Sequence, residues 1–223
     1  MHPNPSRKIL VVGATGGSGR AAVAALVEAG HHVTAFSRRA ETLLQDFPDI
    51  TAINGDVMNP DDVDRAVAGH DSVVITLGIT ENPIRVRWLG PARTPLDVRS
   101  TGTNNVIDAM HAHGVDRLVV QSSYGVGETR QRLGLRDRLF FALLVKNQMA
   151  DTEIQEQVVR ASGLDWTLIQ PVHLNDTIPE VDAFRSTTGE TRAMKVSRLA
   201  VGKAVADVVA DSTYSYQTVS ISG

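Results

Sequence analysis

The apolar residues of this chain gather in short runs that alternate with longer helical patterns. In a repeated unit, a helical pattern stops at a glycine and a β-branched apolar run begins a few residues later, at Gly30, Gly69, Gly114 and Gly163. A helix often ends at a residue with positive φ, which glycine adopts without strain. The expected strands are Lys8–Val12, His32–Phe36, Ile50–Ile53, Ser72–Leu77, Arg117–Gln121, Trp166–Ile169 and Gln217–Ile221.

Strands that alternate with helices along the chain predict parallel strands joined by crossover helices. The strands are nearly all apolar, as expected when helices cover both faces of a sheet. The pattern therefore predicts a Rossmann-like, doubly wound α/β fold with a mostly parallel sheet of about seven strands. We expect one domain over residues 1–223, with residues 171–196 as an irregular cap.

Composition narrows the function classes. The chain has 223 residues and no cysteine, so disulfides, thiolate metal sites and cysteine nucleophiles are excluded. The histidines form no ligand cluster with carboxylates, and we expect no metal. A net charge of −3 does not favour nucleic acid, and no apolar run approaches the ~20 residues needed to span a bilayer. Without a signal-peptide pattern, we expect a cytoplasmic monomer or small homo-oligomer that binds a small molecule.

A glycine-rich turn carries the strongest functional signal. The segment Gly13-Ala14-Thr15-Gly16-Gly17-Ser18-Gly19 directly follows the first expected strand and precedes an alanine-rich helical pattern. In a dinucleotide site, such glycines allow a tight turn, close approach to a pyrophosphate, and close packing of helix on strand. The N–H groups at the helix start then face the phosphates. A strand-to-helix loop without a ligand is the weaker alternative.

The end of the second strand bears on which dinucleotide is bound. An acidic residue there would favour NAD, whereas this chain has Ser37, Arg38 and Arg39, which suit the 2′-phosphate of NADP. The alternative is that both arginines face solvent or pair with Glu41. After the third strand, Asp56 is expected to accept from the adenine amino group beside Val57, or else to cap the next helix. Three further residues are expected where the cofactor's middle passes: Thr76, Leu77 and Gly78.

These motifs resemble the atypical short-chain dehydrogenase/reductases, and within them the flavin reductase/biliverdin-IXβ reductase group. The glycine turn, Arg38, Gly55-Asp56-Val57 and the segment Ala109–Arg117 carry the resemblance. It implies an active-site serine at Ser123 with Ser122 beside the cofactor, and it places Pro171 and His173 near the nicotinamide. It also implies NADP(H) as cofactor, with a flavin as a possible substrate.

One common catalytic pair is missing from the sequence. Neither Tyr124, Tyr214 nor Tyr216 has a lysine four residues on, so the Tyr-x-x-x-Lys pair of typical short-chain dehydrogenases is absent. A conjugated acceptor spreads the negative charge that an added hydride brings. The protein can therefore promote hydride transfer by placing the nicotinamide against the acceptor. Ser123 is then expected to hydrogen-bond the nicotinamide or the substrate, and His173 to cover the ring or relay a proton. The alternative for both residues is that their side chains only form hydrogen bonds within a turn or loop.

Two basic segments are candidates for substrate binding, residues 82–99 and 128–138. Arginine beside tryptophan suits a flat anionic ligand, so Trp88, Arg85 and Arg87 are expected to contact substrate, together with Tyr124. Exposed loops with solvated charges are the alternative.

The sequence thus favours an NADPH-dependent reductase that acts on a flavin, a tetrapyrrole or a quinone-like molecule. Two alternatives stay open. One is a non-catalytic NADP-binding sensor or scaffold of the nitrogen-regulator type, and the other is a reductase or isomerase of an unrelated metabolite.

Overall fold

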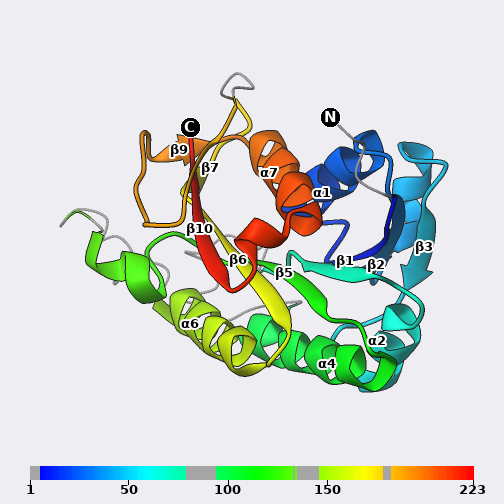
Figure 1. The fold of residues 1–223 in the computed structure, drawn as a ribbon. Helices are drawn as coiled ribbons and strands as arrows, with labels where there is room; N and C mark the ends of the chain where they lie inside the picture. Colours follow the sequence, from blue (N-terminus) through cyan, green and yellow to red (C-terminus); the bar gives the residue numbers. More distant parts are fainter. Residues whose placement is uncertain (1–5, 79–93, 133, 135–145, 178–181) are drawn as a thin grey trace.

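A computed structural model describes residues 6–78, 94–132, 134, 146–177 and 182–223 (Figure 1). Its main sheet has eight strands in the order β3-β2-β1-β4-β5-β6-β10-β8. The strands are β1 (Lys8–Val12), β2 (His32–Ser37), β3 (Thr51–Asn54), β4 (Ser72–Ile75), β5 (Arg117–Gln121), β6 (Asp165–Pro171), β8 (Phe184–Ser186) and β10 (Gln217–Ser222). All neighbouring strands pair in parallel except β8, which runs antiparallel to β10.

The predicted fold class is confirmed, with one added strand. All seven expected strands are present, although the run that begins at Ser72 ends as a strand at Ile75, before Thr76 and Leu77. The eighth strand, β8, lies in residues 171–196, and the same segment holds a two-stranded sheet of β7 (His173–Leu174) and β9 (Lys195–Val196). These elements are too short and polar to stand out as apolar runs.

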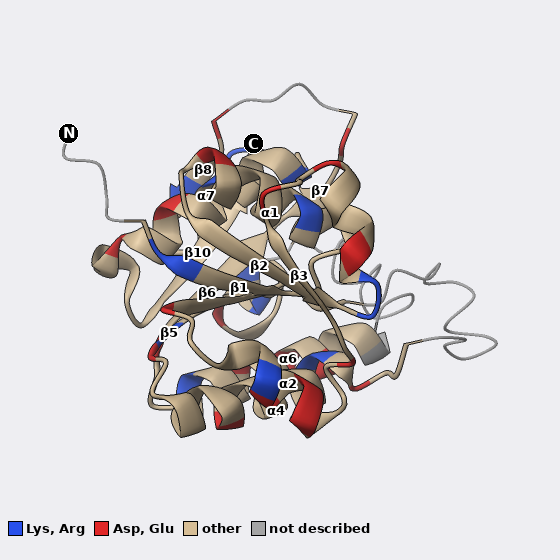
Figure 2. Ribbon diagram, turned by 90° about the vertical axis from the view of Figure 1, so that its right-hand side faces the viewer, with Lys and Arg blue, Asp and Glu red and all other residues tan. Residues whose placement is uncertain are grey.

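Helices cover both faces of the sheet (Figure 2). One layer holds α1 (Gly17–Glu28) and α7 (Arg198–Ala210), and the other holds α2 (Pro60–Val67), α4 (Val98–His113) and α6 (Lys146–Ala161). Short 3-10 turns, η1 (Ala40–Gln45), η2 (Gly127–Arg132) and η3 (Ser212–Tyr214), complete the described elements. The glycines expected to end helices all have positive φ, at Gly30, Gly69, Gly114 and Gly163.

Each face of the sheet has its own apolar core. Ile9 and Val11 of β1 pack toward the layer of α1 and α7, whereas Leu10 and Val12 pack toward the layer of α2 and α4. Side chains that alternate between two covered faces make the strand apolar throughout, as the sequence indicates.

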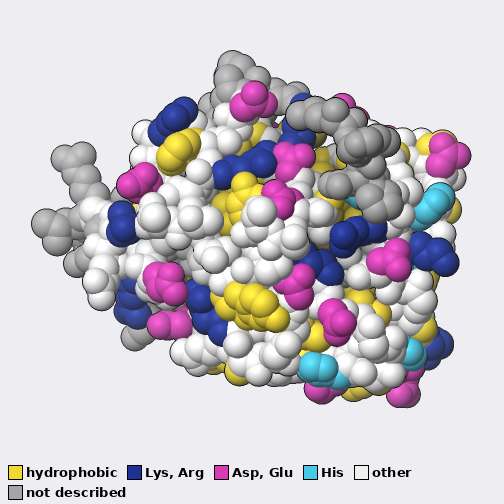
Figure 3. Space-filling view, in the orientation of Figure 1, with side chains coloured by type: hydrophobic (Ala, Val, Ile, Leu, Met, Phe, Trp, Pro, Cys, Tyr) yellow, Lys and Arg dark blue, Asp and Glu magenta, His cyan; other side chains and the backbone are white. Residues whose placement is uncertain are grey.

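On the face shown in Figure 3, basic and acidic side chains are interspersed rather than separated into patches of one sign. Among the described residues, no helix has both the length and the apolar character required to cross a bilayer.

A buried polar network holds α6 against the ends of β5 and β6. Glu156 of α6 is only 2% exposed, and its Oε1 accepts from the Ser122 hydroxyl and from Nε2 of Gln170, the latter at 2.7 Å. Its Oε2 has no hydrogen-bond partner among the described residues, and the Arg160 guanidinium lies 3.7 Å away. Burial raises the pKa of Glu156, although the bonds from Ser122 and Gln170 oppose the shift.

This pKa shift predicts a stability that falls with pH. Because the unfolded chain releases the Glu156 proton first, the free energy of unfolding should fall as pH rises from the ordinary value of 4.5 toward the raised folded-state pKa. Glu156→Gln keeps an acceptor for Ser122 and Gln170 and removes the titration. The free energy of unfolding of the variant, relative to that of the wild type, should therefore rise by up to about 1.4 kcal/mol per pH unit in that window.

Urea unfolding at several pH values between 5 and 8 measures this difference. A suitable control is Glu153→Gln, which changes a partly exposed carboxyl on the same helix and should leave the pH profile as it is. Parallel profiles for wild type and Glu156→Gln would contradict the buried-acid interpretation.

Candidate functional site

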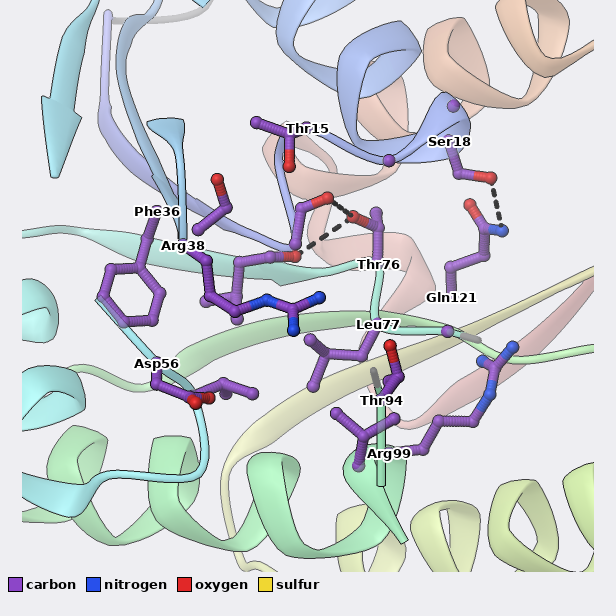
Figure 4. Close-up of a pocket in the computed structure, with 18 of the residues that line it drawn as sticks. Thr15, Ser18, Phe36, Arg38, Asp56, Thr76, Leu77, Thr94, Arg99 and Gln121 are labelled. Carbon is purple, nitrogen blue, oxygen red and sulfur yellow. Dashed lines mark hydrogen bonds between the residues drawn. The ribbon is translucent and has the colours of Figure 1, made fainter. Parts of the chain in front are cut away.

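A cleft of about 870 Å³ lies at the carboxyl ends of the central strands (Figure 4). The strand order reverses between β1 and β4, and such switch points are where doubly wound folds bind ligands. The cleft volume falls within the roughly 300–1,000 Å³ typical of small-molecule sites. Residues that follow β1, β2, β3 and β4 all line it, together with the last residue of β5.

The glycine-rich turn forms the floor of the cleft between β1 and α1. Gly13 has φ +81° and a Cβ there would lie 3.0 Å from the Thr76 carbonyl oxygen, while a Cβ on Gly19 would lie 2.2 Å from the Gly13 oxygen. Only glycine fits either position. No side chain caps α1 at its N-cap residue, Gly16. The turn thus leaves the N-terminal end of α1 open to the cleft, where its dipole favours an anion.

At the end of β2, three predicted residues line the cleft together. Ser37, Arg38 and Arg39 lie on the same side as Asp56 and Val57, which follow β3. Figure 4 shows Arg38 beside Phe36 and Asp56. Two guanidinium groups and one hydroxyl therefore lie where the adenine half of a dinucleotide would be placed.

Asp56 does not cap α2, so that alternative interpretation is wrong. Asn59 is the N-cap, and its side chain accepts from the N–H of Asp61 at 3.1 Å. The Asp56 carboxylate instead accepts from the N–H of Met58 at 3.0 Å, and the Asp56 N–H donates to Asp62. That backbone bond lowers the pKa of Asp62. The turn fixes Asp56 at the cleft wall.

The other half of the cleft is built around the ends of β4 and β5. Thr76, Leu77 and Gly78 line it as expected. The Thr76 hydroxyl donates to the Val12 carbonyl at 3.0 Å, which ties β4 to β1. Gln121 of β5 donates from Nε2 to the Ser18 hydroxyl at 3.0 Å and so connects this half of the cleft to the glycine turn.

The cleft is also lined by two arginines that were not assigned to it from the sequence, Arg99 and Arg198. Arg99, in the first turn of α4, reaches Gly78, where a Cβ would lie 2.9 Å from its Nη2. Arg198 begins α7 and lies over Gly17, where a Cβ would lie 2.9 Å from its Nε. It also forms an ion pair with Asp176. Arg99 falls in the basic segment 82–99, whereas Arg198 is distant in sequence from every motif and has no local signal.

Several predicted site residues lie outside the cleft lining. Ser122 is 3% exposed and its hydroxyl donates to Glu156. Tyr124 is 5% exposed, and its hydroxyl donates to the Gly189 carbonyl at 3.1 Å. Pro171 is buried and pairs with Ile221 of β10. The structure therefore does not bring these side chains to the cofactor cleft.

The two predicted catalytic residues border the cleft without lining it. Ser123 is half-buried and comes two residues after Gln121, and its hydroxyl donates to the Tyr124 carbonyl at 3.4 Å. His173 is exposed and precedes Leu174, which lines the cleft. Because side chains alternate along a strand, His173 faces away from Leu174.

The predicted substrate residues Trp88, Arg85 and Arg87 lie outside the described residues. In the second basic segment, Arg130 forms an ion pair with Glu153 at 3.5 Å. Arg132 lies against Gly189, where a Cβ would lie 3.0 Å from its Nε. Neither Arg130 nor Arg132 lines the cleft.

The residues present fit a phosphate-bearing dinucleotide. The glycine turn packs so tightly that a Cβ at Gly13 or Gly19 would clash with backbone carbonyl oxygens, and the open end of α1 lies beside the Arg198 side chain. Arg38 and Arg39 add positive charge where the cleft passes the end of β2. Aligned N–H groups, a helix dipole and guanidinium groups are the donors that phosphates prefer.

Solved structures share this fold. A short-chain dehydrogenase/reductase from Veillonella parvula in complex with NADP is similar with a TM-score of 0.77 at 18% identity, covering 98% of this chain and 95% of that chain. ChuY, described as an anaerobillin reductase from Escherichia coli O157:H7, is similar with a TM-score of 0.73 at 20% identity, covering 96% of both chains.

Sequence relatives extend the similarity. An uncharacterized chloroplastic protein of Arabidopsis thaliana is 25% identical over 219 residues, which is 97% of this chain and 76% of the relative. A 2-alkyl-3-oxoalkanoate reductase of Stenotrophomonas maltophilia is 39% identical over 119 residues, which is 53% of this chain but only 34% of that reductase. A family model described as NAD(P)H-binding matches residues 13–212 and so spans the glycine turn, both halves of the cleft and α7. The chain therefore belongs to the NAD(P)H-binding family.

Proposed function

We propose that this protein is an NADPH-dependent reductase that transfers hydride to a flavin, a tetrapyrrole or a quinone-like small molecule. The observation that carries the proposal is the placement of Ser37, Arg38 and Arg39 in the wall of a cleft whose floor is the glycine turn. No acidic side chain takes the place at the end of β2 where a carboxylate would select NAD.

The positive side chains of the cleft match the separate anionic groups of NADP(H). Arg38 and Arg39 would hold the 2′-phosphate, because guanidinium groups bind phosphate with bidentate, charge-assisted hydrogen bonds. The N–H groups at the start of α1 would hold the diphosphate, with Arg198 beside Gly17 as a further cation. Asp56 would accept from the adenine amino group.

The chain would contribute to the reaction by placing the cofactor and the substrate against each other and by excluding water. When bound, the reduced nicotinamide supplies the hydride. The part of the cleft proposed to hold the nicotinamide has apolar walls, which limit the access of water. These walls are formed by Leu77, Val98 and Leu174. Ser123 would donate a hydrogen bond to the substrate or to the nicotinamide amide from the end of β5. His173 is exposed, so a role near the ring would require a change in its orientation.

The relatives support a reductase without fixing its acceptor. The anaerobillin reductase shares only the fold with this chain, and the 2-alkyl-3-oxoalkanoate reductase matches over about half of it. One observation favours a non-catalytic NADP-binding sensor as a second candidate. The buried hydroxyls of Ser122 and Tyr124 are committed to Glu156 and Gly189, so neither is in place to act as an acid.

Removing Arg38 should weaken binding of NADPH far more than binding of NADH. A hydrogen bond to a charged group is worth about 1.5–3 kcal/mol, so Arg38→Ala should raise the dissociation constant for NADPH roughly 10- to 150-fold. The matched variant Arg198→Ala should weaken both nucleotides to a similar extent, because the diphosphate is common to them. Titration calorimetry with each nucleotide measures both effects. Equal losses for NADPH and NADH in Arg38→Ala would remove Arg38 from the 2′-phosphate site.

Oxidation of NADPH should depend on a conjugated acceptor. We expect the absorbance of NADPH at its nicotinamide band to fall in the presence of at least one of FMN, riboflavin, biliverdin or a simple quinone. Ser123→Ala should then lower kcat while leaving the affinity for NADPH nearly intact, since Ser123 does not line the part of the cleft that would hold the phosphates. Tight NADPH binding with no oxidation across this panel would refute the reductase and favour the sensor.

A further inference from the structure

The cleft contains one arginine for which the cofactor offers no anion. Arg99 lies at the opposite end of the cleft from Arg38, beside Gln121 and with Leu77 between the two arginines (Figure 4). The negative charges of NADP(H) lie on its 2′-phosphate and its diphosphate. If these occupy the surroundings of Arg38 and the glycine turn, only the nicotinamide half, which carries no negative charge, lies near Arg99.

The start of α4 fixes the direction in which Arg99 extends. Asp151 of α6 is 6% exposed and accepts from the N–H groups of Arg99 and Ser100, at 3.0 and 3.2 Å, and from the Ser100 hydroxyl at 2.5 Å. Asp97, the N-cap residue of α4 itself, makes no capping bond from its side chain. A carboxylate on a neighbouring helix therefore caps α4 and holds the backbone of Arg99 in place.

The Arg99 side chain is directed at the cleft. The two carboxylate oxygens of Asp151 accept from backbone and hydroxyl donors, whereas the guanidinium extends to Gly78, where even a Cβ would come within 2.9 Å of Nη2. Gly78 follows Thr76 and Leu77 in the cleft lining. A cation held partly out of water at the wall of a binding site is a strong partner for an anionic ligand group.

We propose that Arg99 binds an anionic oxygen group, a carboxylate or a phosphate, of the molecule that accepts the hydride. The inference rests on the proposed reductase function and adds a charge requirement to it. An acceptor with such a group bonded to Arg99 has its conjugated part directed toward the apolar walls formed by Leu77 and Leu174. Arg99 is thus a specificity residue for substrate, in contrast to Arg38, which distinguishes the cofactors.

Two matched pairs of ligands test this inference by equilibrium binding to protein saturated with NADP⁺. FMN and riboflavin differ by a phosphate, whereas biliverdin and its dimethyl ester differ by two carboxylates, so the pairs also distinguish the two anion sources. The wild type should bind the anionic member of at least one pair about 10-fold or more tightly than the neutral member. Arg99→Gln should abolish that preference, leave binding of the neutral member within about twofold, and leave the NADPH dissociation constant unchanged.

Two further variants make the result decisive. Arg99→Lys keeps the charge and should restore part of the preference, while Arg185→Gln removes one positive charge at β8, away from the cleft, and should preserve the preference in full. Equal weakening of anionic and neutral ligands in Arg99→Gln, loss of NADPH affinity, or a wild type that does not prefer the anionic members would each overturn the inference. A charge preference that depends on Arg99 without any turnover would refute the reductase alone and leave the anion site standing.

Discussion

The close approach of β1, α1 and β4 is the constraint on which the rest of the site depends. Gly13 and Gly19 let the backbone of the turn lie against the Thr76 and Gly13 carbonyl groups, at distances that exclude any Cβ. Because Gly16 leaves the start of α1 without a side-chain cap, the helix presents its N–H groups to the cleft rather than to its own chain. The switch of strand order between β1 and β4 then opens space for a ligand directly above that helix end.

Positively charged side chains are distributed along the whole length of the cleft. Arg38 and Arg39 follow β2, Arg198 lies over the glycine turn, and Arg99 lies at the far end beside Gly78. The arginines after β2, Arg198 and Arg99 come from three different parts of the fold, so the arrangement depends on the packing of both helix layers. Under the proposed function, cofactor choice and substrate choice would be altered by substitutions at separate residues.

The sequence predicts the fold well because its decisive signals are local. Apolar runs that follow Gly30, Gly69, Gly114 and Gly163 mark strands after helices, and all four glycines have the positive φ expected of helix ends. The glycine turn and the residues after β2, β3 and β4 are likewise local motifs. Arg198, in contrast, reaches Gly17 only through the packing of α7 on α1, and Arg99 is directed by Asp151 of α6, so neither role could be predicted from neighbouring residues. The Ser122 hydroxyl donates to Glu156 of α6, a contact between distant segments that a motif alone does not supply.

Hydrogen–deuterium exchange with and without saturating NADPH reports where along the chain the nucleotide lies. NADPH bound in this cleft should slow exchange in peptides that contain Gly13–Ser18, Ser37–Arg39 and Thr76–Gly78, with little change at β8 and β10. Binding of NADPH that leaves exchange at Gly13–Ser18 unaltered, or that slows it only elsewhere in the chain, would show that the nucleotide does not lie over the glycine turn.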